Sequence, residues 1–345
     1  MREKILVLGY FGYSKNELNG QTSKTRNVYE MLQSKSENLG EITYFDTQIF
    51  QFSKFSIFTM FKKVAQCDKL IYIPAHNNLQ YLFPFIYFIS RIRKSKILLI
   101  AVGGWLDIFI KSKKLHIILL AKIEGIFLQS ERLRESLIAK YKFANVHYFP
   151  NFRINSFVPS YTKNEVFKIV FMARITRLKG MDYVFQLANY FSLHAKDESH
   201  VLIDFYGPIN KEDENYFKDQ IKKHKIISYK GILEPDKIYT TLNEYDLLVL
   251  PTRYPGEGFP GTILDAYISG IPVVVSDWKY NSEFVDQGKT GFLFDLNKED
   301  EFHFYVDKLY YDPELLLQMK RNAFEKSKNY TPEYAWGIIE NFLVG

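Results

Sequence analysis

The stretch Leu250–Ser276, LPTRYPGEGFPGTILDAYISGIPVVVS, contains the pattern that decides the fold. An apolar run ends at Leu250, a loop rich in proline and glycine follows it, and a helix is expected to begin near Gly261–Thr262. A second apolar run comes after Gly270. A strand, a loop, a helix and another strand in this order form the repeating unit of a parallel α/β sheet.

The same alternation of short β-rich runs and helical segments continues along the chain in both directions. In the N-terminal half we expect strands at Lys4–Leu8, Glu41–Phe45, Lys69–Ile73, Lys96–Val102, Gly125–Leu128 and Asn145–Phe149. In the C-terminal half we expect strands at Phe167–Met172, Val201–Tyr206, Ile226–Tyr229, Asp246–Leu250, Pro272–Val275 and Gly291–Phe294. The pattern predicts an α/β protein of two Rossmann-like domains, with parallel sheets whose ligand-binding loops face a common cleft.

A segment with little periodicity, Pro150–Lys163, separates the two series of strands and is rich in Pro, Ser, Asn and Thr. The length of 345 residues also exceeds the usual size of one domain. We therefore predict an N-terminal domain of residues 1–152 and a C-terminal domain of residues 153–329. A last helix within residues 330–345 is expected to pack on the N-terminal domain.

Basic residues are concentrated in the N-terminal half. Through Phe152 the chain has 22 Lys and Arg against 11 Asp and Glu, whereas the remainder has 23 against 28. A basic half favours partners that carry phosphate groups, among them an anionic membrane surface. Phe50–Lys63 and Lys111–Lys122 have the mixture of aromatic residues and lysines that is typical of interfacial segments. Core aromatic residues with merely solvated lysines are the alternative.

The cysteine content and the apolar stretches indicate in which cellular compartment the protein is located. The single cysteine, Cys67, excludes an intramolecular disulfide and a cysteine-based zinc site. Met1–Gly9 contains an apolar run of only five residues and predicts a first strand rather than a secretion signal. The longest apolar stretch, Leu79–Ser90, is too short to span a bilayer. We expect a cytoplasmic protein that attaches peripherally to the inner face of the cell membrane.

Two acidic residues flank the expected helix start in the opening stretch. Glu257 lies in the loop before it, and Asp265 follows eight positions later, about one turn inside the helix. The free N–H groups at the helix start can bind an anion between these two acceptors. A nucleotide sugar presents sugar hydroxyls, a diphosphate and ribose hydroxyls in the same order. In the alternative interpretation Glu257 only interacts with the helix dipole and Asp265 is a solvated residue.

These residues resemble a known family. Glu257 and Asp265, with Gly-Phe-Pro-Gly between them, are similar to the E-x7-E motif of the retaining family 4 glycosyltransferases of GT-B fold, a bacterial cell-surface polysaccharide type. FMARITRLKG at Phe171–Gly180 is similar to the family's G-R-L-x3-K-G motif, with Ala173 in place of the usual glycine. Further matches are Gly270–Val274, Asp277–Glu283, Gly288–Phe292 and, near the N-terminus, Asn19–Arg26.

The resemblance implies a role for each matching residue. The implied catalytic residues are Glu257, which would hold the donor sugar, and Arg174 and Lys179, which would neutralise the leaving diphosphate. Gly258, Phe259 and Gly261 would add backbone contacts, Thr262 would meet the diphosphate, and Asp265 would accept the ribose hydroxyls. Physical reasoning independently favours cations there, because negative charge develops on the departing phosphate oxygen.

Two departures from the motif concern the donor. Asp265 is one methylene shorter than the usual glutamate, so its contact with ribose is expected to be looser or water-mediated. Pro260 has no N–H group, which removes one backbone contact to the sugar.

The acceptor side is less well defined by the sequence. The Asn19–Arg26 loop contributes Gly20 and Gln21 as candidates. Many relatives have a histidine after the strand that matches Lys96–Val102, but this chain does not. His76 and Asp107 are the nearby substitutes, each of which has a structural role as its alternative.

The competing functions are weaker. A dinucleotide dehydrogenase would have G-x-G-x-x-G after the first strand, whereas this chain has Gly9-Tyr-Phe-Gly12, and Asp46 lies 37 residues past Gly9. No D-x-D metal clamp is present, so neither a metal nor another cofactor is expected. No nucleic-acid reader motif is found.

We predict a retaining, metal-independent glycosyltransferase that uses a nucleotide sugar, with UDP favoured, and a glycan or lipid-linked glycan acceptor. The alternative is a non-catalytic GT-B subunit that stabilises a partner enzyme.

Overall fold

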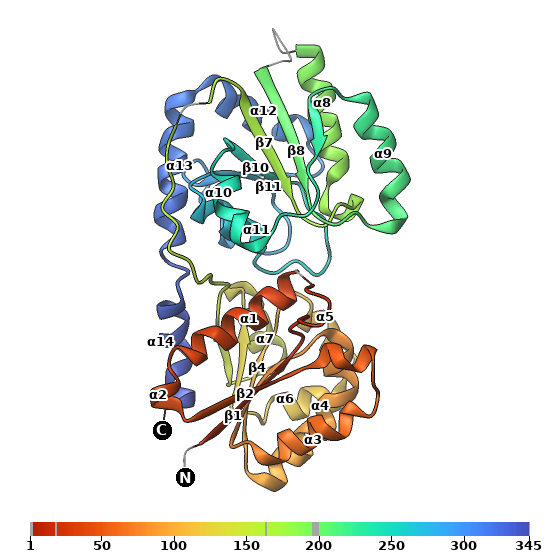
Figure 1. The fold of residues 1–345 in the computed structure, drawn as a ribbon, viewed down its shortest axis with the longest axis vertical. Helices are drawn as coiled ribbons and strands as arrows, with labels where there is room; N and C mark the ends of the chain where they lie inside the picture. Colours follow the sequence, from red (N-terminus) through yellow and green to blue (C-terminus); the bar gives the residue numbers. More distant parts are fainter. Residues whose placement is uncertain (1–2, 18, 163, 195–199, 345) are drawn as a thin grey trace. The chain divides into compact units, whose positions relative to one another are not determined.

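The computed structural model describes residues 3–17, 19–162, 164–194 and 200–344, and its contacts divide the chain into two compact units (Figure 1). Unit 1 consists of Met1–Ile154, Gly256–Phe259 and Tyr330–Gly345, and unit 2 consists of Asn155–Pro255 and Pro260–Asn329. The short segment Gly256–Phe259 makes its contacts with unit 1, although we expected it in the C-terminal domain.

Unit 1 is built on a six-stranded parallel sheet in the order β2-β1-β3-β4-β5-β6. Its strands are β1 (Lys4–Gly9), β2 (Glu41–Asp46), β3 (Lys69–Ile73), β4 (Lys96–Ile100), β5 (Gly125–Leu128) and β6 (Val146–Tyr148). The central strands are buried along their length, which explains their continuous apolar runs. All six expected strands of this half are confirmed, with ends that shift by one or two residues.

Helices cover both faces of this sheet. They are α1 (Gly20–Gln33), α2 (Ser36–Leu39), α3 (Ser56–Gln66), α4 (His76–Arg93), α5 (Leu106–Ile110), α6 (Lys114–Leu120), α7 (Glu131–Tyr141) and the C-terminal α14 (Pro332–Leu343). On one face, α1 and α14 pack on β1 and β3, and Val28, Ala335 and Ile339 belong to one buried cluster. Lys69 Nζ donates to the carbonyl oxygen of Leu343 at 2.6 Å, which fixes the end of α14.

The other face of the sheet carries α3, α4 and α6, which lie together at the lower right of Figure 1. Met60 and Val64 of α3 and Leu79 and Phe83 of α4 are turned inward and buried. None of the helices in the described ranges combines the length and apolar character that crossing a bilayer would require.

Unit 2 repeats the architecture with a six-stranded parallel sheet in the order β12-β11-β10-β7-β8-β9. The strands are β7 (Phe167–Met172), β8 (Val201–Tyr206), β9 (Ile227–Tyr229), β10 (Leu247–Leu250), β11 (Val273–Ser276) and β12 (Gly291–Phe294). The helices are α8 (Met181–His194), α9 (Glu214–Lys223), α10 (Ile238–Leu242), α11 (Gly261–Ile268), α12 (Glu299–Tyr311) and α13 (Pro313–Ser327). The expected strands of the second half are therefore also confirmed.

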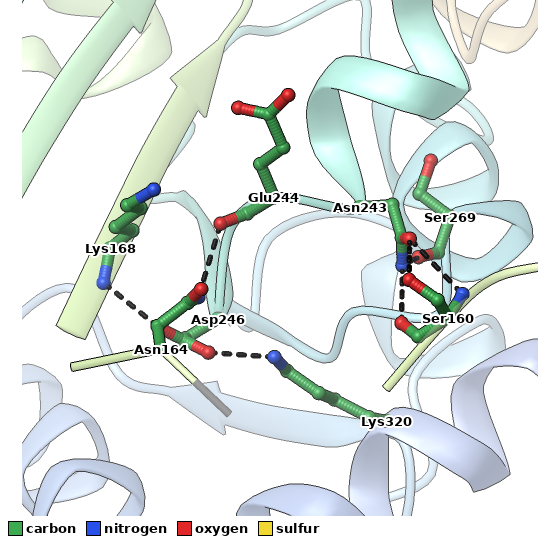
Figure 2. A network of polar contacts seen from close by, with 8 residues as sticks. All are labelled: Ser160, Asn164, Lys168, Asn243, Glu244, Asp246, Ser269 and Lys320. Atoms are coloured by element: carbon green, nitrogen blue, oxygen red, sulfur yellow. Dashed lines mark hydrogen bonds and ion pairs between the residues drawn. The ribbon is translucent and has the colours of Figure 1, made fainter. Parts of the chain in front are cut away.

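A buried charge pair anchors the start of unit 2 to its sheet. Asp246, just before β10, accepts from Lys320 Nζ of α13 at 2.6 Å and from Asn164 Nδ2 and the backbone N–H of Lys168 at 3.0 Å each (Figure 2). Both charged side chains are less than a tenth exposed. A charge pair buried in this way costs several kcal/mol when one partner is removed. The network therefore connects the segment before β7 with β10 and α13.

Candidate functional site

The strand order of unit 2 reverses between β7 and β10, which are parallel neighbours. Ligands of open α/β sheets bind beside such a reversal, outside the carboxyl ends of the strands. The loops that leave β7 and β10 at this edge span residues 173–180 and 251–260. These are the two loops that carry the candidate donor-binding residues of unit 2, so the topology brings Arg174 and Lys179 to the same edge as the start of α11.

The two loops are fastened to each other at a glycine. Gly180 has φ +87°, and a Cβ there would collide with the backbone carbonyl of Pro251, so only glycine fits. The backbone N–H of Arg253 donates to the carbonyl oxygen of Leu178 at 2.9 Å. The Lys179 ammonium lies 4.9 Å from the centroid of the Tyr254 ring. The position of Lys179 is therefore set by the loop that follows β10.

Arg174 is held differently. It lies in a short extension of β7 in which the neighbouring N–H of Ile175 donates to the Pro208 carbonyl oxygen at 2.9 Å. Its side chain is exposed, and it forms no hydrogen bond or ion pair with any residue that the structure describes. A guanidinium without a carboxylate partner at this edge is available to an anionic ligand.

A hollow of about 420 Å³ lies beside the same loop. It is lined by Arg177, Asp182, Tyr183, Gln186, Tyr216 and Arg253. Its cations are engaged within the protein: Arg253 lies 3.6 Å from the Asp182 carboxylate, and the Arg177 guanidinium lies 4.2 Å from the centroid of the Tyr216 ring. Neither Arg174 nor Lys179 lines this hollow, so the donor candidates are distinct from it.

The N-terminus of α11 is open. The helix begins at Gly261 after Pro260, and no side chain caps it. The hydroxyl of Thr262 is buried and has no hydrogen-bond partner among the described residues. The Ile263 N–H donates to the Pro260 carbonyl oxygen at 3.1 Å, which leaves the N–H groups of Gly261 and Thr262 without an acceptor among the described residues. A buried hydroxyl without a partner is unfavourable, and these two N–H groups lie next to it in the chain at the positive end of the helix dipole. Together they form a donor set that suits a phosphate group.

Asp265 is 5% exposed on the first turns of the same helix. The interpretation of Asp265 as a solvated surface residue is therefore wrong. The Asp265 carboxylate points into the protein. This orientation is expected of a residue that binds a ligand or supports a ligand-binding residue.

The segment Gly256–Phe259 is held inside unit 1 by backbone contacts. The Gly256 carbonyl oxygen accepts from the Gly104 N–H at 3.1 Å. The Phe259 carbonyl oxygen accepts from Asn151 Nδ2 at 2.6 Å. A Cβ on Gly258 would lie 2.8 Å from Gly103, so the backbone passes too closely for any larger residue.

This arrangement fixes Glu257, which is 6% exposed. Gln129 links the two residues that contact the neighbours of Glu257, because it accepts from the Gly103 N–H at 2.8 Å and donates to Asn151 at 2.5 Å. Sequence reasoning missed Gln129 and Asn151. Gln129 directly follows β5 and Asn151 comes three residues after β6. These positions were the available signal, since side chains at strand ends gather at one edge of a parallel sheet.

The strand order of unit 1 reverses between β1 and β3, and three acceptor-side candidates lie at this edge of the sheet. Gln21 Nε2 donates to the Ile73 carbonyl oxygen at the end of β3, at 3.1 Å. His76 begins α4 three residues later, is exposed, and has its ring 5.3 Å from that of Trp105. Gly20 is exposed, and a Cβ there would meet nothing within 4 Å.

Asp107 does not join this group through any contact. Its carboxylate accepts from Lys140 Nζ at 2.6 Å and from the Tyr141 hydroxyl at 3.4 Å, both on α7. These contacts give Asp107 a structural function between α5 and α7. Across the described ranges, no group of three or more His, Cys, Asp or Glu side chains is arranged to hold a metal ion.

Two comparisons of sequence bear on this geometry. The profile of the family described as "Glycosyl transferases group 1" matches residues 153–326, half of the chain. The poly(ribitol-phosphate) alpha-N-acetylglucosaminyltransferase of Staphylococcus aureus is 30% identical over 246 residues, 68% of this chain and 46% of that protein. The alpha-D-kanosaminyltransferase of Streptomyces kanamyceticus is 24% identical over 155 residues, 45% of this chain and 39% of that protein. The chain spans less than half the length of these curated relatives.

Solved structures show the same fold. HepE of Anabaena, solved with UDP and glucose, has a TM-score of 0.73 at 13% identity, covering 99% of both chains. A TarM variant of S. aureus, solved with fondaparinux, alpha-GlcNAc-glycerol and UDP, has a TM-score of 0.67 at 19% identity, covering 80% of this chain and 55% of the other. At these identities the likeness concerns the fold, and it confirms the expected GT-B architecture.

Proposed function

Because the chain belongs to the glycosyl transferases group 1 family, we propose that it transfers a sugar from a nucleotide diphosphate sugar to a glycan or lipid-linked glycan. UDP is the favoured carrier, since both structural neighbours named above were solved with it. We propose that the transfer retains the anomeric configuration and needs no metal ion. The pathway we favour is the synthesis of a capsule, exopolysaccharide or lipopolysaccharide.

One observation carries this proposal: the open N-terminus of α11, with the buried and unpartnered hydroxyl of Thr262 beside it. The donor's diphosphate would accept from this hydroxyl and from the first N–H groups of the helix. Asp265, one turn further along, would accept from the ribose. The unpaired Arg174 and the fixed Lys179 lie on the neighbouring loop at the same sheet edge.

The chemistry follows from where charge develops. Transfer breaks the bond between the anomeric carbon and the diphosphate oxygen, and that oxygen keeps the electron pair. The attacking acceptor hydroxyl forms the new bond to the anomeric carbon and passes its proton to the departing diphosphate. Arg174 and Lys179 would stabilise the growing negative charge more strongly in the transition state than in the ground state. Two cations held by the protein can therefore do the work that a metal ion does in other transferases.

The donor sugar would be held by Gly256–Phe259, the segment that belongs to unit 1 by its contacts. Glu257 would accept from the ring hydroxyls, while the backbone of Gly258, Phe259 and Gly261 adds contacts. The contacts of Gly256 and Phe259 with Gly104 and Asn151 hold the backbone on both sides of Glu257, which would position its carboxylate before the donor arrives. A prepositioned acceptor of this kind has little reorganisation to complete during the reaction.

Thermal unfolding with nucleoside diphosphates tests the donor site. A ligand that binds only the folded state stabilises it by about 2.7 kcal/mol at one hundred times its Kd. We expect UDP to raise the melting temperature more than GDP, ADP or uridine at equal concentration. If no nucleoside diphosphate has an effect, the proposed donor site is wrong. Where UDP binds, NMR of the product formed in excess EDTA tests retention and metal independence together.

A further inference from the structure

The face of unit 1 formed by α3, α4 and α6 has a large exposed apolar surface. Along α4 the exposed residues Tyr81, Phe85, Phe88 and Ile92 follow one another at intervals of four, three and four. These intervals place all four on one stripe of the helix. The inward stripe of α4 is apolar as well. This helix is therefore apolar on the side that faces away from the sheet, where a water-exposed helix would be polar.

Exposed apolar residues on neighbouring elements add to this apolar surface. On α3 and just before it, Phe55 and Phe58 are 81% and 69% exposed. The rings of Phe61 and Phe85 lie 6.4 Å apart, which joins α3 to the stripe of α4. We call this surface the aromatic face; its exposed members are Phe52, Phe55, Phe58, Tyr81, Phe85, Phe88, Ile92, Ile108, Leu115 and Ile118.

A proline explains how α6 is fixed beside α4. Pro84 inside α4 cannot donate to the Gln80 carbonyl, which is left without its usual helical partner. His116 Nε2 of α6 donates to the carbonyl oxygens of Leu79 and Gln80, at 3.1 and 3.2 Å. The exposed Leu115 and Ile118 of α6 are thereby held next to the stripe of α4.

Basic side chains are distributed over the same elements. Residues 47–122 contain twelve Lys and Arg but only two acidic residues, Asp68 and Asp107. Asp107 pairs with Lys140 on α7, and Asp68 accepts from the backbone N–H of Lys4. Eleven of these twelve cations form no ion pair with any residue in the described ranges: Lys54, Lys62, Lys63, Arg91, Arg93, Lys94, Lys96, Lys111, Lys113, Lys114 and Lys122.

We propose that the aromatic face docks unit 1 on an anionic lipid bilayer. The rings and aliphatic side chains would enter the boundary between headgroups and acyl chains, and the surrounding cations would meet lipid phosphates. A second copy of the chain fits this face poorly, because a two-fold pairing would bring the unpaired cations of both copies together. Nucleic acid fits poorly as well, since Ile92, Leu115 and Ile118 cannot stack on bases. This docking does not depend on the proposed transfer activity.

Vesicle flotation with the full chain tests the docking. The vesicles are phosphatidylcholine with 40% phosphatidylglycerol, or phosphatidylcholine alone, each at about 0.1 M and about 1 M salt. Screening shortens the Debye length from about 10 Å to about 3 Å over this range. We expect binding to the anionic vesicles that falls at least about tenfold at high salt. Equal binding to both vesicle types, or none to either, overturns the proposal.

Two variants separate the contributions of charge and apolar surface. Lys62→Glu, Lys111→Glu and Lys114→Glu together should weaken binding about 100-fold, since each basic residue near such a surface contributes about 1 kcal/mol. Phe58→Ser with Phe88→Ser should weaken binding at both salt concentrations. Unaltered melting temperatures show that both variants remain folded. Wild-type binding by either variant contradicts the proposal.

A matched control keeps the net charge equal. Lys223→Glu, Lys225→Glu and Lys237→Glu change exposed lysines of unit 2 and also lower the formal charge from +6 to zero. This control should bind as the wild type does, and equal loss would mean that net charge alone drives binding. A concentration-dependent dimer that the serine variant dissociates would assign the face to a second copy. Tighter binding to a DNA duplex than to the vesicles would assign it to nucleic acid, and either result overturns the proposal.

Discussion

The first turns of α1 and α11 differ in how their N–H groups are satisfied, although each helix starts at a glycine beside a strand-order reversal. At α1, Asn19 accepts from the N–H groups of Gln21 and Thr22, and Thr22 Oγ1 accepts from the N–H of Asn19. At α11 the residue before the helix is Pro260, no side chain caps it, and the Thr262 hydroxyl is unpartnered.

This difference in capping indicates which helix start can bind an anion. A capping box satisfies the donors of a helix start and stabilises the fold locally. An open start leaves the donors for a ligand at some cost in stability. Stability and binding are therefore assigned to different helix starts in the two units, and substitutions at each should affect one property and spare the other.

The largest expected effect concerns the cations next to the open start. Arg174→Ala with Lys179→Ala should lower kcat by about 10³-fold, because both charges would act on the leaving diphosphate. Initial rates at saturating donor measure this. Arg177→Ala is the matched control, since Arg177 lies in the same loop but is engaged with Tyr216. Its rate should stay within about threefold of wild type, and a double variant that keeps a tenth of the activity would contradict the assignment.

Glu257 gives the next largest effect. Glu257→Ala should lower kcat/KM by about 10²-fold, the scale of one lost preorganised contact, with an unchanged melting temperature. Glu17, in the loop before α1, is the comparison residue, because its carboxylate accepts from the Tyr10 hydroxyl and the Gln48 amide within unit 1. Glu17→Ala should mainly reduce stability. Turnover of the Glu257 variant at the wild-type rate would remove this residue from the donor site.

The sequence predicted the layout better than it predicted the details that make the site work. Strands such as Lys69–Ile73 and Phe167–Met172 were predicted with their observed ends, because buried parallel strands are short, continuously apolar runs between turn residues. The glycine-bearing loops were predicted as well, since glycine, proline and their neighbours mark turns strongly.

Long-range contacts were not predictable in the same way. Nothing near Gly256–Phe259 in the sequence indicates that Gly104 and Asn151 hold it, because these partners are more than a hundred residues away. The burial of Asp265 could not be decided from the sequence either: a solvated carboxylate stayed open as the alternative to a ribose-binding one, since acidic residues are mostly exposed. Pairings of this kind depend on how strand ends gather in space, which a single sequence does not specify.

A reciprocal pair of substitutions sharpens the comparison of the two helix starts. Thr262→Val removes a buried hydroxyl without a partner, so the melting temperature should stay constant or rise. The same change should weaken UDP binding about tenfold, because a hydrogen bond to a charged group is lost. Asn19→Ala removes a cap worth about 1 kcal/mol and should lower the melting temperature by about 2–4 °C while UDP binding is unchanged. Calorimetric titration and thermal unfolding measure both, and the comparison fails if Asn19→Ala weakens UDP binding as much as Thr262→Val does.

The smallest effect is expected at Gly20, the first residue of α1. Its backbone does not need a glycine, and the space in front of it is open, so Gly20→Ala should stabilise the fold by about 0.4–1 kcal/mol. If the acceptor uses that open space, the added methyl group should raise the KM for the acceptor a few-fold and leave the KM for the donor unchanged. Initial rates with each substrate varied in turn separate the two constants. A variant that gains stability with both KM values unchanged would show that Gly20 only starts a capped helix, and the acceptor would then have to bind elsewhere on the unit.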